Sequence, residues 1–147
     1  MAGRRLLLIG QSLGGHTAML AAARHPELVE RLVVIEASPE RDPDGPERIR
    51  TFFEAIPAAY AVALDPAQSA ASVEEIAARD WWDEWRAVRC PVLVVRGERG
   101  HLDASVAARM CAENGNAAEV CIAAAGHDVH LDQPTALADA IARFVRA

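Results

Sequence analysis

A serine flanked by glycines near the amino terminus constrains this chain more than any other feature. An aliphatic run, Leu6–Ile9, leads directly into Gly10-Gln11-Ser12-Leu13-Gly14, and a helix of small residues is predicted over His16–Arg24. A strand–turn–helix of this kind strains the serine backbone, and we expect a Cβ two residues before or after Ser12 to collide with the crossing strand and helix. The pattern predicts a hydroxyl at a helix amino terminus, where N–H groups and the helix dipole favour developing negative charge. The alternative is an ordinary turn in which Ser12 caps the helix.

Strand-like and helix-like segments alternate along the rest of the chain. Further strands are predicted at Leu32–Ile35, Pro91–Val95 and Val120–Ala124. Continuous aliphatic strands are typical of parallel strands covered on both faces. Helices are predicted over Asp103–Asn114 and at the carboxyl terminus, where apolar residues follow a helical period: Leu137, Ala140, Ile141, Phe144 and Val145. The order predicts an α/β fold with about four mainly parallel strands flanked by helices.

The stretch between the second and third strands has a different character. Proline and glycine mark a break after Ser38, a helix interrupted at Pro57 is predicted over Glu47–Leu64, and a second helix over Ser72–Val88. Most aromatic residues of the chain lie in this stretch. We expect Trp81 and Trp85, four residues apart, to pack the insertion onto the core.

In this order, these motifs resemble the α/β-hydrolase superfamily. The Gly-x-Ser-x-Gly turn is similar to its nucleophile elbow, and Gly126-His127 after the fourth strand is similar to its catalytic-histidine loop. The resemblance covers essentially the whole chain but only the second half of the family's usual domain. It implies a partial α/β-hydrolase fold: a single, N-terminally truncated domain over residues 1–147, with a small helical cap insertion at about 39–88.

The same resemblance predicts an exposed edge. A strand that is central in a full sheet, Leu6–Ile9, becomes an edge strand here, with unpaired N–H and C=O groups that invite pairing with another chain. We therefore expect either self-association through this strand or a partner that covers it.

The resemblance also implies a catalytic serine, histidine and acid. Ser12 is the expected nucleophile and His127 the expected base, because serine needs a base within hydrogen-bond reach. His130 is expected to brace the loop, whereas His16 and His25 are expected to be structural or at the surface.

Two carboxylates compete for the role of the acid. In the commoner family arrangement the acid follows the third strand in a Gly-x-x-Asp pattern, and the matching position here holds Gly100, so Asp103 would have to be displaced. In the other arrangement it ends the strand after the elbow, where Glu36 lies. We favour Glu36 over Asp103, because a carboxylate that ends an apolar strand needs a partner such as an imidazole. Glu98 ranks third. The alternative role of Asp103 is to cap the following helix. The alternative role of Glu36 is a salt bridge from the end of its strand to the cap insertion.

Stabilisation of an oxyanion requires two donors. The Leu13 N–H is expected to supply one, and the second belongs to the half of the family's domain that this chain lacks. The loss of one donor costs about 10²–10³ in turnover, so weak catalysis is expected from the chain alone. The expected substrate-binding residues are Gln11, Phe52, Phe53 and Tyr60, although the three aromatics could equally well pack the insertion onto the core.

The expected function is hydrolysis of a small ester, lactone or related acyl compound through an acyl-enzyme, and acyl transfer to another acceptor uses the same triad. No metal and no organic cofactor are implied. The alternative is a non-catalytic fragment or interaction module that binds a partner through the exposed half-sheet.

Composition limits the binding partners and the cellular location that are expected for this chain. A net charge of −6 argues against binding to nucleic acid or an anionic membrane surface. The cysteines Cys90, Cys111 and Cys121 lack metal-ligand spacing and are expected to be buried, reduced thiols. No apolar stretch approaches the ~20 residues of a membrane span, and the amino-terminal apolar run is too short for a signal peptide, so a cytoplasmic location is expected.

Overall fold

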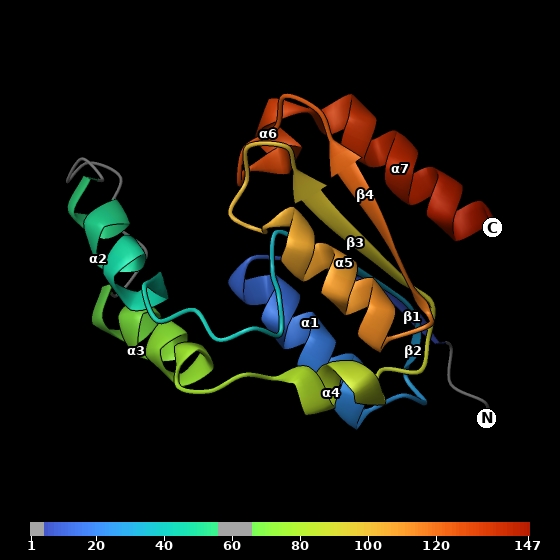
Figure 1. Ribbon diagram of the computed structural model, residues 1–147, viewed down its shortest axis with the longest axis horizontal. Coiled ribbons are helices and arrows are strands. Elements are labelled where there is room, and N and C mark those ends of the chain that lie inside the picture. Colours follow the sequence, from blue (N-terminus) through green and yellow to red (C-terminus); the bar gives the residue numbers. More distant parts are fainter. Residues whose placement is uncertain (1–4, 56–65) are drawn as a thin grey trace. The chain divides into compact units, whose positions relative to one another are not determined.

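The computed structural model describes residues 5–55 and 66–147. It contains a parallel sheet of four strands in the order β1-β2-β3-β4 (Figure 1). The strands are β1 (Leu6–Gln11), β2 (Val29–Ile35), β3 (Val92–Gly97) and β4 (Ala117–Ile122). Since each strand pairs with the next one in the chain and all run in the same direction, their carboxyl ends lie along one edge of the sheet. The predicted fold class is confirmed.

Helices follow the strands. The first strand leads into α1 (Leu13–Arg24), the third into α5 (Ala104–Glu113), and the fourth into α6 (Val129–Asp132) and α7 (Pro134–Arg146). A short helix, α4 (Trp82–Ala87), precedes β3.

Different helices cover the two faces of the sheet. Successive side chains of a strand point to opposite faces, so neighbouring residues show which helix covers each face. Val33 and Leu93 belong to one buried cluster with Leu137 and Ala140 of α7. Val34, on the opposite face, is close to Gly15 at the start of α1. Ile141 and Phe144 pack against the same cluster, so four of the five residues of the predicted apolar period cover one face of the sheet, whereas Val145 is 42% exposed.

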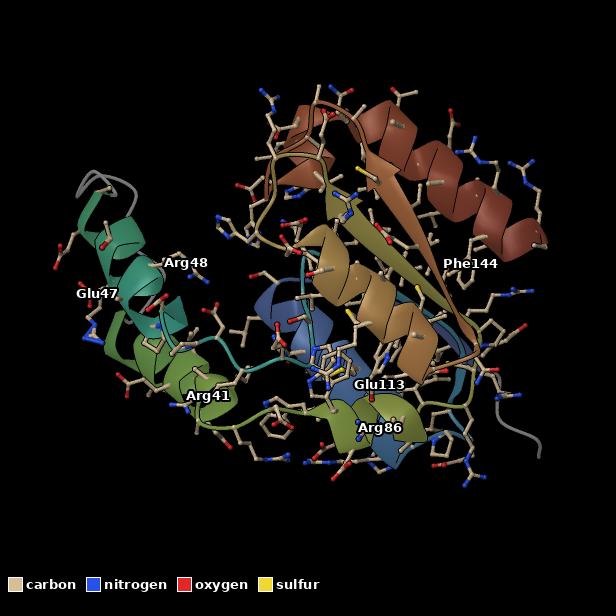
Figure 2. The ribbon with its side chains drawn as sticks, viewed as in Figure 1. Arg41, Glu47, Arg48, Arg86, Glu113 and Phe144 are labelled. Carbon is tan, nitrogen blue, oxygen red and sulfur yellow. The ribbon has the colours of Figure 1, made fainter. Side chains whose placement is uncertain are left out.

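Two short helices are joined beside the sheet. Trp85 of α4 is fully buried, and its indole nitrogen donates to the Met110 carbonyl of α5 at 2.8 Å. Figure 2 shows Arg86 of α4 and Glu113 of α5 pointing toward each other, and Arg86 Nε donates to Glu113 Oε2 at 2.7 Å. Asn114 reaches back to the Trp85 and Val88 carbonyls.

Several predicted elements differ from the structure in their bounds, and in two of them a specific backbone angle or hydrogen bond accounts for the difference. The fourth strand was predicted over Val120–Ala124, but it begins at Ala117 and ends at Ile122, because Ala124 has a positive φ of 59° that turns the chain out of the sheet. The single helix predicted over Ser72–Val88 is wrong. The α3 helix (Pro66–Ala77) ends where the Trp81 indole donates to the Ile76 carbonyl, one of the carbonyls that a helix end leaves without an intrahelical partner.

The edge strand β1 is apolar but largely uncovered. Leu6, Leu7 and Ile9 are 52%, 40% and 50% exposed, whereas Leu32 and Val33 of β2, which pair with Leu8 and Ile9, are fully buried. The chain thus carries an exposed apolar edge, and the self-association expected from it stays a prediction.

The chain divides into two compact units, residues 1–39 with 82–147, and residues 40–81. The second unit contains α2 (Gly45–Ala55) and α3. Arg50 of α2 lies 3.8 Å from Glu74 of α3, and Arg41 donates to the Ala77 carbonyl. The cap predicted over 39–88 stays a prediction, and α4 within that range belongs to the sheet unit.

The burial expected of the three cysteines is only partly correct. Cys90 is buried, but Cys111 is partly exposed, and Cys121, which lies on the edge strand β4, is exposed.

Within the described ranges, no helix combines the length and the apolar character needed to cross a bilayer.

Candidate active site

Strained backbone marks the carboxyl edge of the sheet. Among the described residues, positive φ angles outside glycine occur at Ser12, Glu36 and Ala124, with values of 52°, 50° and 59°. Ser12 and Glu36 directly follow β1 and β2, and Ala124 follows β4 by two residues. Such conformations cost about 1–3 kcal/mol each and cluster at functional sites. The strain therefore points to this edge as the candidate site.

The glycines around Ser12 have unequal roles. A Cβ at Gly10 would collide with the Gly14 carbonyl, as expected from the sequence. The same expectation is wrong for Gly14, where a Cβ would meet no atom within 4 Å. The crowded position is Gly15, whose added Cβ would lie 2.7 Å from Ala37 Cβ. The close approach thus occurs one residue later, where α1 crosses the segment after β2.

Ser12 itself lies between a strand end and a helix start. Its N–H donates to the Ile35 carbonyl at 2.9 Å, and its own carbonyl accepts from the N–H groups of Gly15 and His16. Leu13 is the first residue of α1, where backbone N–H groups have no intrahelical acceptor. The amino end of α1 therefore presents backbone N–H donors directly after Ser12, and the Ser12 side chain forms no hydrogen bond that caps the helix.

Glu36 is a buried carboxylate held by backbone donors. Its side chain has no exposed surface. Oε1 accepts from the Gly97 N–H at 2.8 Å, and Oε2 accepts from the His101 and Leu102 N–H groups at 2.6 and 3.3 Å. His127 Nδ1 lies 3.3 Å from Oε2. The loop after β3 therefore wraps around this carboxylate.

The departure at Gly100 from the commoner family pattern has a steric reason. A Cβ at Gly100 would collide with all three atoms of the Glu36 carboxyl group. An aspartate at that position and a glutamate at position 36 therefore exclude each other in this geometry. The loop has room for a single carboxylate, and Glu36 occupies it.

Burial and hydrogen bonding act in opposite directions on the pKa of Glu36. Burial raises it, but the hydrogen bonds from His127 and from the Gly97, His101 and Leu102 amides outweigh burial and hold the pKa below its ordinary value of 4.5. Glu36 is thus a carboxylate at neutral pH, able to accept a hydrogen bond from an imidazole.

His127 is oriented by this carboxylate. Because an ionised carboxylate only accepts hydrogen bonds, the proton of a neutral His127 ring is placed on Nδ1, which leaves Nε2 with its lone pair. The His101 ring stacks on the His127 ring, with centroids 4.4 Å apart and planes at 21°. His127 is partly exposed. A partly exposed imidazole with a lone pair on Nε2 is suited to general-base chemistry.

The elbow and the His127 loop are joined through Gln11. Gln11 Nε2 donates to the His127 carbonyl at 3.0 Å and to Asp128 Oδ1 at 3.1 Å. Within the described part of the chain, Ser12 Oγ and the His127 ring form no hydrogen bond with each other. The structure thus brings Glu36 and His127 together directly, and links Ser12 to them through the neighbouring side chain.

The other candidate acids lie elsewhere. Asp103 is exposed and caps α5. Its Oδ1 accepts from the Ser105 hydroxyl at 2.5 Å and from the Ser105 N–H at 2.7 Å, and these two bonds lower the pKa of Asp103. Glu98 Oε2 accepts from the Ala124 N–H at 2.8 Å. Neither carboxylate contacts the His127 ring among the described contacts, so Glu36 is the carboxylate that the fold pairs with it.

The expected substrate-binding aromatics give no geometry. Tyr60 lies outside the described residues, and the side chains of Phe52 and Phe53 are outside the described part of the structure. Gln11 lies at the edge but is engaged with the His127 loop, and its contact with substrate stays a prediction.

Sequence reasoning missed one feature of the site and anticipated a second only in part. The stacking of His101 on His127 had no signal, because the two residues meet only through the packing of the loops after β3 and β4. The link between Gln11 and His130, 2.7 Å from Gln11 Oε1 to His130 Nδ1, was partly anticipated by the expectation that His130 braces the loop.

Comparison with known proteins gives short local matches in sequence and a long match in structure. The chain is 46% identical over 52 residues to sn-1-specific diacylglycerol lipase ABHD11 of Mus musculus, a match covering 35% of this chain and 17% of the relative. It is 57% identical over 35 residues to a putative esterase/lipase of Haemophilus influenzae, which covers 24% of this chain and 12% of that protein. The matched segments are thus less than a fifth of either curated relative.

The solved enol-lactonase of Burkholderia xenovorans has a similar fold. The TM-score is 0.81 at 20% identity, and the match covers 97% of this chain and 66% of the lactonase chain. The chain therefore spans about two thirds of that solved structure. The pattern of the alpha/beta hydrolase family matches residues 1–140, so the chain belongs to the alpha/beta hydrolase family.

Proposed function

We propose that this chain carries the nucleophile, base and acid of a serine hydrolase that acts on a small ester, lactone or related acyl compound. The observation that supports this most is the Glu36–His127 pair, buried on its carboxylate side and lying at the same sheet edge as the strained Ser12. The esterase, lipase and lactonase names of the similar proteins support the substrate class.

The proposed reaction follows from the roles of these groups. Ser12 Oγ attacks the acyl carbonyl carbon while His127 Nε2 takes its proton, and Glu36 stabilises the resulting imidazolium through the Nδ1–H bond. The Leu13 N–H donates to the oxyanion of the tetrahedral intermediate. Collapse of the intermediate expels the alkoxide, which takes the proton from Nε2, and leaves the acyl group on Ser12.

Water then completes the cycle. His127 Nε2 removes a proton from the water as it attacks the acyl-enzyme, and returns the proton to Ser12 Oγ when the acid product leaves. Both steps require His127 Nε2 to come within hydrogen-bond reach of Ser12 Oγ, a bond that tightens when substrate binds in many hydrolases.

A fluorophosphonate probe tests this proposal, because it reacts covalently with an activated serine. Trypsin cleaves after Arg5 and Arg24, so mass spectrometry of the Leu6–Arg24 peptide reports the labelled site. Ser12→Ala should abolish labelling of this peptide with its fold retained. Thr17→Ala is the matched control, because Thr17 carries the other hydroxyl of the same peptide and should leave labelling unchanged. Absence of labelling in the wild-type chain would contradict the proposal.

A second candidate function is a binding module without catalysis. The exposed apolar residues of β1, Leu6, Leu7 and Ile9, favour it, because such an edge can pair with another chain. Sedimentation as a monomer at high concentration would count against this function, and concentration-dependent association that is lost in Ile9→Lys would support it.

A further inference from the structure

The side chain of Gln11 forms three hydrogen bonds with the loop after β4. Nε2 donates to the His127 carbonyl at 3.0 Å and to Asp128 Oδ1 at 3.1 Å, and Oε1 lies 2.7 Å from His130 Nδ1. Gln11 is the last residue of β1 and directly precedes Ser12. A single side chain therefore bonds the segment that carries the candidate nucleophile to the segment that carries the candidate base.

The chemistry of the partners sets the orientation of this amide. A carbonyl and a carboxylate only accept hydrogen bonds, so the atom that faces both must be the NH₂ group. The amide oxygen then faces His130, and the proton between them belongs to His130 Nδ1. All three bonds are consistent with one orientation of Gln11 and one tautomer of His130.

The position of β4 explains why such a link is needed. The β1 and β4 strands form opposite edges of the sheet, so three strand spacings of about 4.8 Å separate them. In Figure 1 the arrowheads of β3 and β4 point toward α6, which follows the His127 loop. The loop must return over the carboxyl edge to bring His127 toward Ser12. The Asp132 carboxylate, which accepts from the Gly126 N–H at 2.7 Å, braces the loop internally but does not tie it to β1.

Glu36 and Gln11 therefore hold His127 from different sides, in addition to the His101 ring that stacks on it. Glu36 at the end of β2 bonds the ring, and Gln11 at the end of β1 bonds the backbone carbonyl. An anchor on the ring alone sets the tautomer, whereas an anchor on the backbone sets how far the loop lies from the elbow.

We propose that Gln11 is a positioning residue that holds the His127 loop at the nucleophile elbow and so sets the reach between His127 and Ser12. This inference rests on the proposed function. In this role Gln11 positions the candidate base His127, which is different from contacting the substrate.

The test compares two variants of Gln11 by their rate of fluorophosphonate labelling. Gln11→Leu removes all three bonds, and Gln11→Glu keeps the shape and the acceptor for His130 but loses both donors and repels Asp128. Both should fold, as judged by circular dichroism, and both should label Ser12 about ten- to a hundred-fold more slowly, the range seen when a supporting contact or an alignment of about 1 Å is lost. His130→Ala, which leaves both donor bonds in place, should have a smaller effect.

A double-mutant cycle separates positioning from damage to the elbow. If Gln11 acts through His127, Gln11→Leu should cause no further loss in a His127→Ala background, because the positioned base is already absent. An equal loss in both backgrounds would overturn the inference. With p-nitrophenyl acetate as the substrate, kcat should fall while KM stays unchanged, and a rise in KM alone would instead support substrate contact.

Nuclear magnetic resonance provides a readout that does not depend on activity. The ¹⁵N shifts of the His130 ring should report the Nδ1–H tautomer in the wild-type chain and a change in Gln11→Leu. If both Gln11 variants are labelled at the wild-type rate, the inference about Gln11 is contradicted and the proposed function is not. Absence of labelling in the wild-type chain would contradict the proposed function, and the inference with it.

Discussion

The carboxyl end of β2 and the loop after β3 lie against each other, yet their carboxylates have opposite surroundings. Glu36 at the end of β2 has a fully buried side chain that accepts from three backbone N–H groups and faces His127. Asp103, beyond the β3 loop, is exposed and accepts hydrogen bonds from Ser105 at the start of its own helix. The difference shows that the surroundings of a carboxylate, rather than its distance from a motif in the chain, decide what it can do.

The β3 loop supplies the donors that make this difference. A buried carboxylate without partners is costly, and the Gly97, His101 and Leu102 amides compensate that cost at Glu36. Gly100 lets the loop approach closely enough to do so. The loop that holds the acid in the commoner family arrangement here serves as the binding site for an acid from the neighbouring strand.

The largest expected effect is that of Glu36→Gln. An amide in place of the carboxylate no longer stabilises the His127 imidazolium or fixes its tautomer, so fluorophosphonate labelling should slow by about 10⁴, the loss seen when the aspartate of a Ser-His-Asp triad becomes an amide. Comparison of labelling rates with those of Asp103→Asn checks this. A loss confined to Asp103→Asn would transfer the role of the acid to Asp103.

A methyl group at Gly100 should disturb the same carboxylate indirectly. Gly100→Ala would collide with Glu36, and overpacking of a close-packed site costs about 1–3 kcal/mol. Urea unfolding should show this loss together with slower labelling. Gly115→Ala is the matched control, since a Cβ there meets no atom within 4 Å. Equal stability of the two variants would mean that the β3 loop can move away from Glu36 at little cost.

The lowered pKa of Glu36 predicts a dependence of stability on pH. A carboxyl group whose pKa is lower in the folded than in the unfolded chain stabilises the fold above its ordinary value of 4.5, and this stabilisation is lost as the pH falls through the folded pKa. The difference in unfolding free energy between wild type and Glu36→Gln should therefore be constant near neutrality and shrink below about pH 4.5. A difference that does not change down to pH 3 would contradict the lowered pKa.

The smallest expected effect is that of Asp103→Asn. Asparagine is as favoured as aspartate at a helix amino terminus, so the cap on α5 should persist through its side-chain oxygen. Melting temperature and labelling rate should both stay close to those of the wild type. A marked fall in labelling without loss of stability would show that Asp103 reaches the base after all.

Local patterns were sufficient for much of the fold. The aliphatic runs predicted the four strands, since a strand covered on both faces needs apolar side chains in succession. The spacing of Leu137, Ala140 and Ile141 predicted the helix that covers one face. The boundaries of β4 and the break between α3 and α4 were not predictable, because a single backbone angle at Ala124 and a tertiary bond from Trp81 set them.

The glycine pattern was only half correct for the same reason. Gly10 is required where the elbow closes on itself, which is a local property of the turn. The requirement at Gly15, rather than Gly14, depends on where Ala37 lies after β2, and that position follows from strand pairing.

By itself the sequence determined the strand–turn–helix around Ser12 and the individual strands, because these depend on residues close together in the chain. The order of the motifs along the chain indicated the family. The tertiary structure alone decided which carboxylate faces His127 and that Gln11 binds the loop on which His127 lies. Glu36, His101 and His127 are remote in sequence and meet only because parallel strands end at one edge of the sheet. A contact of that kind depends on strand order and loop path, and neither is encoded in the spacing of the residues that take part.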